Sequence, residues 1–514
     1  MTERSGTTLR GTRRPPVMVV GAVVFLTLTS IGWILAMPFG GYPDEIDHYG
    51  RSASLASGVL VGGENPALET TPEPEHKSCC EPGNPTALFW VESGVRLVEL
   101  PRTLDPSQLA CVVVVAGPRA RCEVEAPAVA PPRATTMGTI EPLGYLAPGL
   151  AMALARNYSL AFRLGRFANV AVGVLAIGLV LAGTANRRLP IRLVGLCLAC
   201  TPMVIFVLSS GSPNALEIAG ALGAWLAMLE VTSEDGPSSI PLWCGGVLSA
   251  VLLASSRSIG PLWLLAIVGV GLVLRGPVPL MRVIRTQPRR ALGAGLIVAA
   301  ACLTTVAWEV IVQPSVAFDA GFALRQIGPA MSDTSRISHE LIGAFGSLDI
   351  PLPGALVAGW QMLVAAAAGC ALWWGNRRAR SAVILVSAMT VASVALLGAG
   401  VLRQNGFAMQ GRHVLPLALG IPLVAVEALR GREWKMRGFF GGIAVICVPI
   451  QIYAWAFAAR SFGRTVDGLV VVPAFDGSWT PPLAQAGGAL VLIGCLSLGF
   501  VVFRGLWQHD LGDR

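Results

Sequence analysis

Apolar runs of roughly 20 residues recur along almost the whole chain and are separated by short polar segments. Each run is long enough to cross the roughly 30 Å hydrocarbon core of a bilayer. The pattern predicts twelve membrane spans, at about 17–37, 163–183, 190–208, 213–231, 240–256, 258–274, 291–312, 353–374, 381–402, 413–429, 438–458 and 485–503. We therefore expect an all-α polytopic membrane protein whose transmembrane domain occupies residues 17–503.

Positive charge is concentrated in short loops that fall on one side of the membrane under this topology. These loops and the N-terminal tail contain Arg10, Arg13, Arg14, Arg187, Arg188, Arg282, Arg285, Arg289, Arg290, Arg377, Arg378, Arg380, Arg430, Arg432, Lys435 and Arg437. Because short cytoplasmic loops carry an excess of Lys and Arg, we expect the tails 1–16 and 504–514 to be cytoplasmic. The net charge of +8 is then mostly a topology signal, and a nucleic-acid partner is not expected.

The first span has a basic start, as a secretory signal peptide does. It is longer than the usual apolar stretch of such a peptide, and Ala36-Met37-Pro38 is a poor cleavage site. We expect a retained helix.

Two segments on the predicted outer face are too long to be simple connections, at 38–162 and 313–352. The first holds 14 of the 30 acidic residues and four cysteines, and we expect it to form a small α/β subdomain. Cys111 and Cys122 stand at the ends of two predicted strands around the Gly117-Pro118 turn. A disulfide between them is plausible in an exported compartment, but the sequence leaves the pairing open among these two and Cys79 and Cys80.

An ionisable cluster follows the first span directly, where Asp44, Glu45, Asp47 and His48 occur within five positions. In a helix Asp44 and His48 would share a face, and a partly desolvated carboxylate can serve as a general base. Two carboxylates, Asp44 and Glu45, can also hold a divalent cation such as Mg²⁺ or Mn²⁺. The simpler interpretation is a solvated helix end capped by Asp44. The density of four ionisable residues favours a functional site.

Three basic side chains at the predicted outer ends of spans form a second group. Arg257 lies between the fifth and sixth spans, and Arg412 and His413 begin the tenth. Arginine recognises phosphate through paired donors, although such residues also snorkel to lipid headgroups. The sequence contains no zinc-binding pattern, no Gly-x-Ser-x-Gly elbow and no phosphate-binding glycine loop.

These residues carry a resemblance to known proteins. Asp44-Glu45 after the first span resembles the acidic motif of GT-C glycosyltransferases, which take sugars from polyprenyl-phosphate donors. More specifically, the chain resembles a family of bacterial multi-spanning proteins catalogued as a domain of unknown function. The matching segments occur in the expected order and are Pro43-Asp44-Glu45-Ile46-Asp47-His48, Thr201-Pro202-Met203 through Pro213-Asn214, Gly346-Ser347-Leu348-Asp349-Ile350-Pro351 and Gln410-Gly411-Arg412-His413-Val414-Leu415-Pro416.

Two positions depart from the family pattern. His413 stands where the family tends to have tyrosine after the Gly-Arg pair. The segment Glu141-Pro142-Leu143 stands where the family often has a His-Pro-Pro-like sequence. The second departure leaves open whether a histidine there helps to position substrate.

The resemblance implies a GT-C-like membrane domain that transfers a sugar from a polyprenyl phosphate to a glycan or lipid acceptor of the cell envelope. Asp44 would be the general base of an inverting reaction, and Arg412, with Arg257, would neutralise the leaving phosphate. Glu45, Asp47, His48 and His413 would contact substrate. We expect a multi-pass protein of the inner (plasma) membrane, among membrane lipids, with an extracytoplasmic site. A transporter or flippase of lipid-linked sugars and a non-catalytic envelope scaffold are the alternatives.

Overall fold

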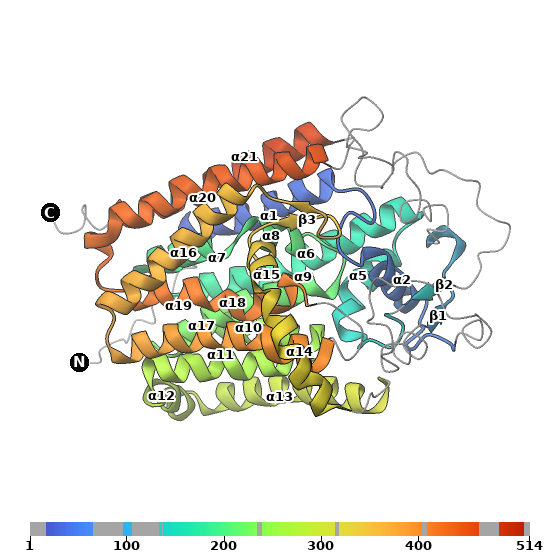
Figure 1. Ribbon diagram of the computed structural model, residues 1–514, viewed down its shortest axis with the longest axis horizontal. Helices are drawn as coiled ribbons and strands as arrows, with labels where there is room; N and C mark the ends of the chain where they lie inside the picture. Colours follow the sequence, from blue (N-terminus) through green and yellow to red (C-terminus); the bar gives the residue numbers. More distant parts are fainter. Residues whose placement is uncertain are drawn as a thin grey trace, which may run out of the picture.

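The computed structural model describes residues 17–64, 96–104, 133–135, 137–233, 239–313, 318–402, 409–461 and 483–507. Within them the chain is an elongated helical bundle (Figure 1). The helices of the bundle are α1 (Val17–Ala36), α6 (Tyr158–Gly183), α7 (Leu189–Ala199), α8 (Pro202–Leu208), α9 (Pro213–Val231), α10 (Ile240–Ser256), α11 (Gly260–Arg275), α12 (Val278–Thr286), α13 (Pro288–Ile311), α16 (Gly354–Trp374), α17 (Arg377–Leu397), α18 (Gly411–Ala418), α19 (Gly420–Ala428), α20 (Glu433–Ser461) and α21 (Ala484–Trp507). The 3-10 turn η5 (Asn186–Arg188) precedes α7, and the short π-helix η6 (Gly398–Leu402) follows α17.

The prediction of an all-α polytopic membrane protein is confirmed. Among the described residues, nine helices are long and apolar enough to cross a membrane, and the number is eleven if each of two bent pairs counts as one span. The 17-residue apolar helix α10 accounts for the remaining predicted span.

The predicted span 190–208 is not one straight helix. It is divided into α7 and α8, which meet at an angle of 87°. Pro202 cannot donate a backbone hydrogen bond, and the Thr201 hydroxyl instead caps α8 by accepting from the Val204 N–H at 3.2 Å. The break follows from this Thr-Pro pair.

The first and last helices run antiparallel and in close contact. A Cβ atom at Gly21 would lie 2.2 Å from Val501, and one at Gly32 would lie 2.5 Å from Val491. Glycine at these positions therefore permits the approach. Val17 and Trp507 consequently lie at the same end of the bundle, the end that Figure 1 shows on the left.

A buried ion-pair network joins four helices at that end. Arg188 of η5 pairs with Glu230 of α9, and Arg192 of α7 pairs with Glu427 of α19. Arg275 of α11 also pairs with Glu427. Buried charges are tolerated when they are paired and hydrogen-bonded, so this network fixes how η5 and the four helices meet.

The opposite end of the bundle, here called the Asp44 end, carries the two long predicted outer segments. The first contains α2 (Glu45–Ala56), η2 (Arg102–Leu104), η4 (Leu143–Tyr145) and α5 (Leu146–Met152), together with strands β1 (Arg96–Val98) and β2 (Arg133–Thr135), which pair antiparallel. The second contains α14 (Ala320–Ser332), α15 (Thr334–Glu340) and the antiparallel pair β3 (Ala344–Phe345) and β4 (Ile350–Pro351). Cys79, Cys80, Cys111 and Cys122 lie outside the described residues, so their pairing stays a prediction.

Candidate functional site

Asp44 stands at the junction between α1 and α2 in an unusual backbone conformation. Its φ of 52° is left-handed, which is uncommon for a residue other than glycine. Its side chain is 43% exposed, whereas the neighbouring Pro43 and Glu45 are buried. The carboxylate accepts a hydrogen bond from Nη2 of Arg412, which lies 368 positions further along the chain. The structure therefore brings together two residues of separate sequence motifs.

The charge state of Asp44 is set by this contact. Burial alone would raise the pKa of the carboxyl, but the Arg412 guanidinium, His48 and Arg257 outweigh it and hold the pKa at about 2. Asp44 is therefore ionised at neutral pH. A general base works best when its pKa lies near the operating pH, so Asp44 is a weak base as long as Arg412 remains its partner.

Arg412 is held in place by the start of α18. Glu340 of α15 accepts a hydrogen bond from the Gly411 N–H at 2.6 Å and is itself paired with Arg336. A Cβ atom at position 411 would lie 2.6 Å from the Cβ of Glu340, so glycine is needed there. The Arg412 side chain is 3% exposed, and its Nε has no hydrogen-bond partner among the described residues.

His48 lies on the first turn of α2 and contacts η4. Its Nδ1 is 2.8 Å from the Tyr145 hydroxyl. Burial, together with the charges of Arg257 and Arg412, lowers the pKa of His48 to about 3 despite the opposing effect of Asp44. The imidazole is therefore neutral, and its buried Nε2 has no hydrogen-bond partner among the described residues.

Arg257 interacts electrostatically with most of the ionisable residues around Asp44. It follows the last residue of α10, is 26% exposed, and places its Nε 3.9 Å from Oε2 of Glu217 on α9. Its charge also acts on Asp44, on Arg412 and on His413. His413 accepts from the Gln410 N–H through Nδ1 at 3.4 Å. Five of the seven predicted site residues therefore lie within one electrostatic environment, namely Asp44, His48, Arg257, Arg412 and His413.

Glu45 points elsewhere, although it follows Asp44 directly. Its carboxylate forms a two-pronged ion pair with Arg166 of α6, at 2.6 and 2.7 Å, and accepts from the Gly40 N–H at 2.8 Å. Arg166 also donates to the carbonyls of Met37 and Pro38. Both side chains are buried. The pair therefore fixes the turn that presents Asp44, and a contact between Glu45 and substrate stays a prediction.

Arg166 was not singled out from the sequence because a single arginine near the start of an apolar helix usually faces the membrane interface.

Asp47 is half-buried, and its backbone carbonyl accepts from the Thr135 hydroxyl at 3.2 Å. This contact ties α2 to β2. Substrate binding by Asp47 stays a prediction.

The arrangement does not fit the predicted cation site. Asp44 faces Arg412, and both Glu45 oxygens are occupied by Arg166 and Gly40. Nor does the described part of the chain contain a group of three or more His, Cys, Asp or Glu side chains that could hold a metal ion. We assign no chemical step to a cation.

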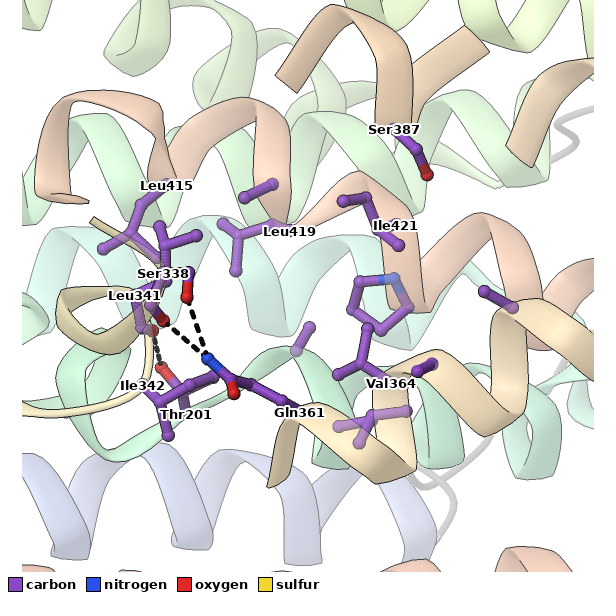
Figure 2. A pocket seen from close by; sticks show the side chains of 16 residues that line it. Thr201, Ser338, Leu341, Ile342, Gln361, Val364, Ser387, Leu415, Leu419 and Ile421 are labelled. Carbon is purple, nitrogen blue, oxygen red and sulfur yellow. Dashed lines mark hydrogen bonds between the residues drawn. The ribbon is translucent and has the colours of Figure 1, made fainter. Parts of the chain in front are cut away.

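A cavity of about 320 Å³ lies along α18 and α19 (Figure 2). Its wall is mostly apolar and includes Leu415, which is one helical turn beyond Arg412, and Val364 of α16. Of the four polar side chains in the wall, Gln361 donates to Ser338 and Thr201 donates to the Leu341 carbonyl, which leaves Ser387 as the other polar group. The cavity is therefore suited to an apolar ligand.

A sequence model of one protein family, described as "Predicted membrane protein (DUF2142)", matches residues 26–421. The chain belongs to this family. The match includes Asp44, Arg257 and Arg412, and it confirms the expected relation to a multi-spanning family catalogued as a domain of unknown function. No curated protein and no solved structure matches the chain. Kinship with GT-C glycosyltransferases stays a prediction.

Proposed function

We propose that the protein is a membrane glycosyltransferase that moves a sugar from a polyprenyl-phosphate donor to a glycan or lipid acceptor of the cell envelope. The observation that carries this proposal is the contact between Asp44 and Arg412. It pairs a half-exposed carboxylate with a buried guanidinium, and Arg257 lies close enough to add a second positive charge. The helices α9 and α18 also begin at this end, and helix N-termini favour anions.

The donor phosphate would change the state of Asp44. When a phosphate binds Arg412 and Arg257, it competes with Asp44 for the same donors. The carboxylate then loses its main stabilising partner, and its pKa rises from about 2 towards the ordinary range. Asp44 thus becomes an effective base only when the donor is present.

The reaction would be a direct displacement at the anomeric carbon. The acceptor hydroxyl gives its proton to Asp44 as its oxygen bonds to that carbon, and the bond from the carbon to the phosphate oxygen breaks. The polyprenyl phosphate leaves with the electron pair, and Arg412 and Arg257 stabilise its negative charge. One displacement without a covalent enzyme intermediate inverts the configuration.

The carrier lipid has a suitable place in the molecule. Its first isoprene units would enter the apolar cavity that begins one turn along α18 from Arg412. The positions of the basic loops support an inner-membrane protein with cytoplasmic termini and a site that faces away from the cytoplasm. In this orientation the acceptor approaches the exposed side of Asp44.

The test uses purified full-length protein in lipid nanodiscs with a panel of polyprenyl-phosphate sugars. Release of free polyprenyl phosphate is followed by mass spectrometry for the wild type, Asp44→Asn and the matched control Asp319→Asn. Asp319 caps the exposed start of α14, a role that asparagine also fills. We expect release by the wild type and the control, and a loss of about 10²-fold or more in Asp44→Asn. Retention of more than about a tenth of the activity would rule out Asp44 as the base.

One observation favours transport of a lipid-linked sugar as the second candidate. The low pKa of Asp44 suits an ion pair that opens and closes around a phosphate without proton transfer. A transporter would bind the same donors. When it is reconstituted in vesicles in place of nanodiscs, it would move these donors across the membrane without releasing polyprenyl phosphate. Its activity would survive Asp44→Asn better than it survives Arg412→Gln.

A further inference from the structure

A buried carboxylate beneath Arg257 has no hydrogen-bond partner in the part of the chain that the structure describes. Glu217 lies on the second turn of α9 and is 1% exposed, and neither of its oxygens accepts a hydrogen bond from the described residues. Arg257 is 3.9 Å away, which is too far for a hydrogen bond. Leaving such a group unpaired is costly, so its retention calls for an explanation.

Other unpartnered polar atoms lie next to it. Asn214, three residues earlier on the same face of α9, is also 1% exposed, and its Oδ1 has no partner among the described residues. The indole N–H of Trp263 on α11 lies beside Glu217. It does not form a hydrogen bond with the carboxylate, so this donor is unpaired among the described residues as well. The charges of Arg257 and Arg412 both act on the Glu217 carboxylate. Unused acceptors therefore adjoin the two arginines assigned to the donor phosphate.

We propose that Glu217 and Asn214 bind the ring hydroxyls of the donor's sugar. This inference rests on the proposed function, because it uses the phosphate bound by Arg257 and Arg412 as the anchor. A sugar linked to that phosphate lies within one ring diameter of the arginines, and its hydroxyls supply the donors that the two acceptors lack. The acceptor substrate, by contrast, reaches the exposed side of Asp44, so the buried subsite belongs to the donor.

The chemistry of the subsite limits which donor sugars it can bind. A carboxylate accepts from hydroxyl or amino groups but repels a second carboxylate or phosphate. We therefore infer a donor whose sugar is uncharged or carries an amino group, and not a uronic acid or a phosphorylated sugar.

The experiment compares two ligands on one variant. Full-length wild type and Glu217→Gln in nanodiscs are titrated with a sugar-bearing polyprenyl phosphate and with the same polyprenyl phosphate without the sugar. A hydrogen bond to a charged acceptor corresponds to roughly 10–100-fold in affinity. We expect the Kd of the sugar-bearing donor to rise at least about 10-fold in Glu217→Gln, and that of the bare carrier to change less than about 3-fold. Glu309→Gln, which removes an exposed carboxylate from α13, is the matched control.

A deoxy donor sharpens the assignment. Removing the hydroxyl that Glu217 binds should weaken donor binding to the wild type about 10-fold. It should not weaken donor binding to Glu217→Gln any further. If Glu217→Gln weakens both ligands equally, the residue is a counter-ion for Arg257 and the inference is wrong. An effect on the KM of the acceptor alone would also overturn it. Asn214→Ala repeats the test if Glu217→Gln does not insert.

Failure of the proposed function gives a different result. A wild type that binds the sugar-bearing donor more tightly than the bare carrier, but releases no polyprenyl phosphate, contradicts sugar transfer and leaves the subsite intact. A wild type that turns over while Glu217→Gln binds both ligands normally contradicts the subsite alone.

Discussion

Asp44 and Glu45 are adjacent, yet the structure predicts opposite consequences when each loses its charge. Glu45→Gln replaces a carboxylate that faces three donors: Nε and Nη2 of Arg166 and the N–H of Gly40. Whichever way the new amide is turned, its NH2 group meets one of these N–H groups. The guanidinium of Arg166 also remains buried without its counter-charge.

The magnitude follows from this geometry. Removing one partner of a fully buried ion pair destabilises a protein by about 3–5 kcal/mol. Asp44 is 43% exposed, so water can replace part of what Arg412 loses in Asp44→Asn, and we expect a loss of about 1 kcal/mol or less. Asp44→Asn should therefore lose turnover while keeping its stability. Glu45→Gln should lose stability first.

Thermal unfolding in one detergent, followed by circular dichroism, measures the stability, and release of polyprenyl phosphate in nanodiscs measures turnover. The double variant Glu45→Gln/Arg166→Met is the decisive control. Replacing both members of a buried pair by uncharged groups is often nearly neutral. Because Arg166→Met also removes the donor to the Met37 and Pro38 carbonyls, the double variant should recover part, but not all, of the stability lost in Glu45→Gln. Turnover loss in Glu45→Gln at unchanged stability would refute the structural role of Glu45. A large loss of stability in Asp44→Asn would refute the division between the two residues.

Three further predictions concern the pH dependence and the cavity. The pH dependence of kcat/KM reports the pKa of Asp44 in the free enzyme, and that of kcat reports its pKa in the donor complex. The acid limb of kcat should therefore lie at higher pH than the acid limb of kcat/KM. Coincident limbs would contradict the release of Asp44 by phosphate. Burial raises the pKa of Glu141 to about 7, so wild-type stability falls between about pH 4.5 and 7 as the unfolded state loses this proton first. Glu141→Gln should therefore be more stable than wild type by up to about 3 kcal/mol at pH 8, with the difference shrinking at pH 5, and thermal unfolding at the two pH values checks this. Ala368→Phe, which fills the cavity, should raise the KM for long-chain donors and leave the KM for short-chain donors unchanged. The control Ala366→Phe, on the exposed face of α16, should change neither KM. Equal effects of Ala368→Phe on both chain lengths would exclude the cavity as a lipid site.

The spans could be predicted from the sequence because the bilayer imposes a length and an apolar composition that can be read directly. The predicted ranges 213–231 and 240–256 coincide with α9 and α10. Hydropathy predicts 190–208 as one span, because it carries no information on direction and the apolar run continues through Thr201 and Pro202. The Thr-Pro pair is the local sequence signal for the bend after α7. The candidate site was found in part, because clustered ionisable residues stand out against an apolar background. Their partners could not be predicted, since Arg166 and Tyr145 are linked to the cluster only by the fold.

Asp44 and Glu45 of the Asp-Glu motif have different partners, which shows why sequence spacing alone could not predict their roles. Neighbouring residues at the start of a helix point in different directions, so Asp44 and Glu45 reach different partners, on α18 and α6. The second pair is buried and holds the turn, while the first is open to water and meets the buried charge of Arg412. A fixed turn next to an exposed ion pair is what a phosphate would need in order to displace Asp44 without disturbing the helix that carries it. Under the proposed function, the two carboxylates serve one site, with Glu45 setting the position from which Asp44 would act.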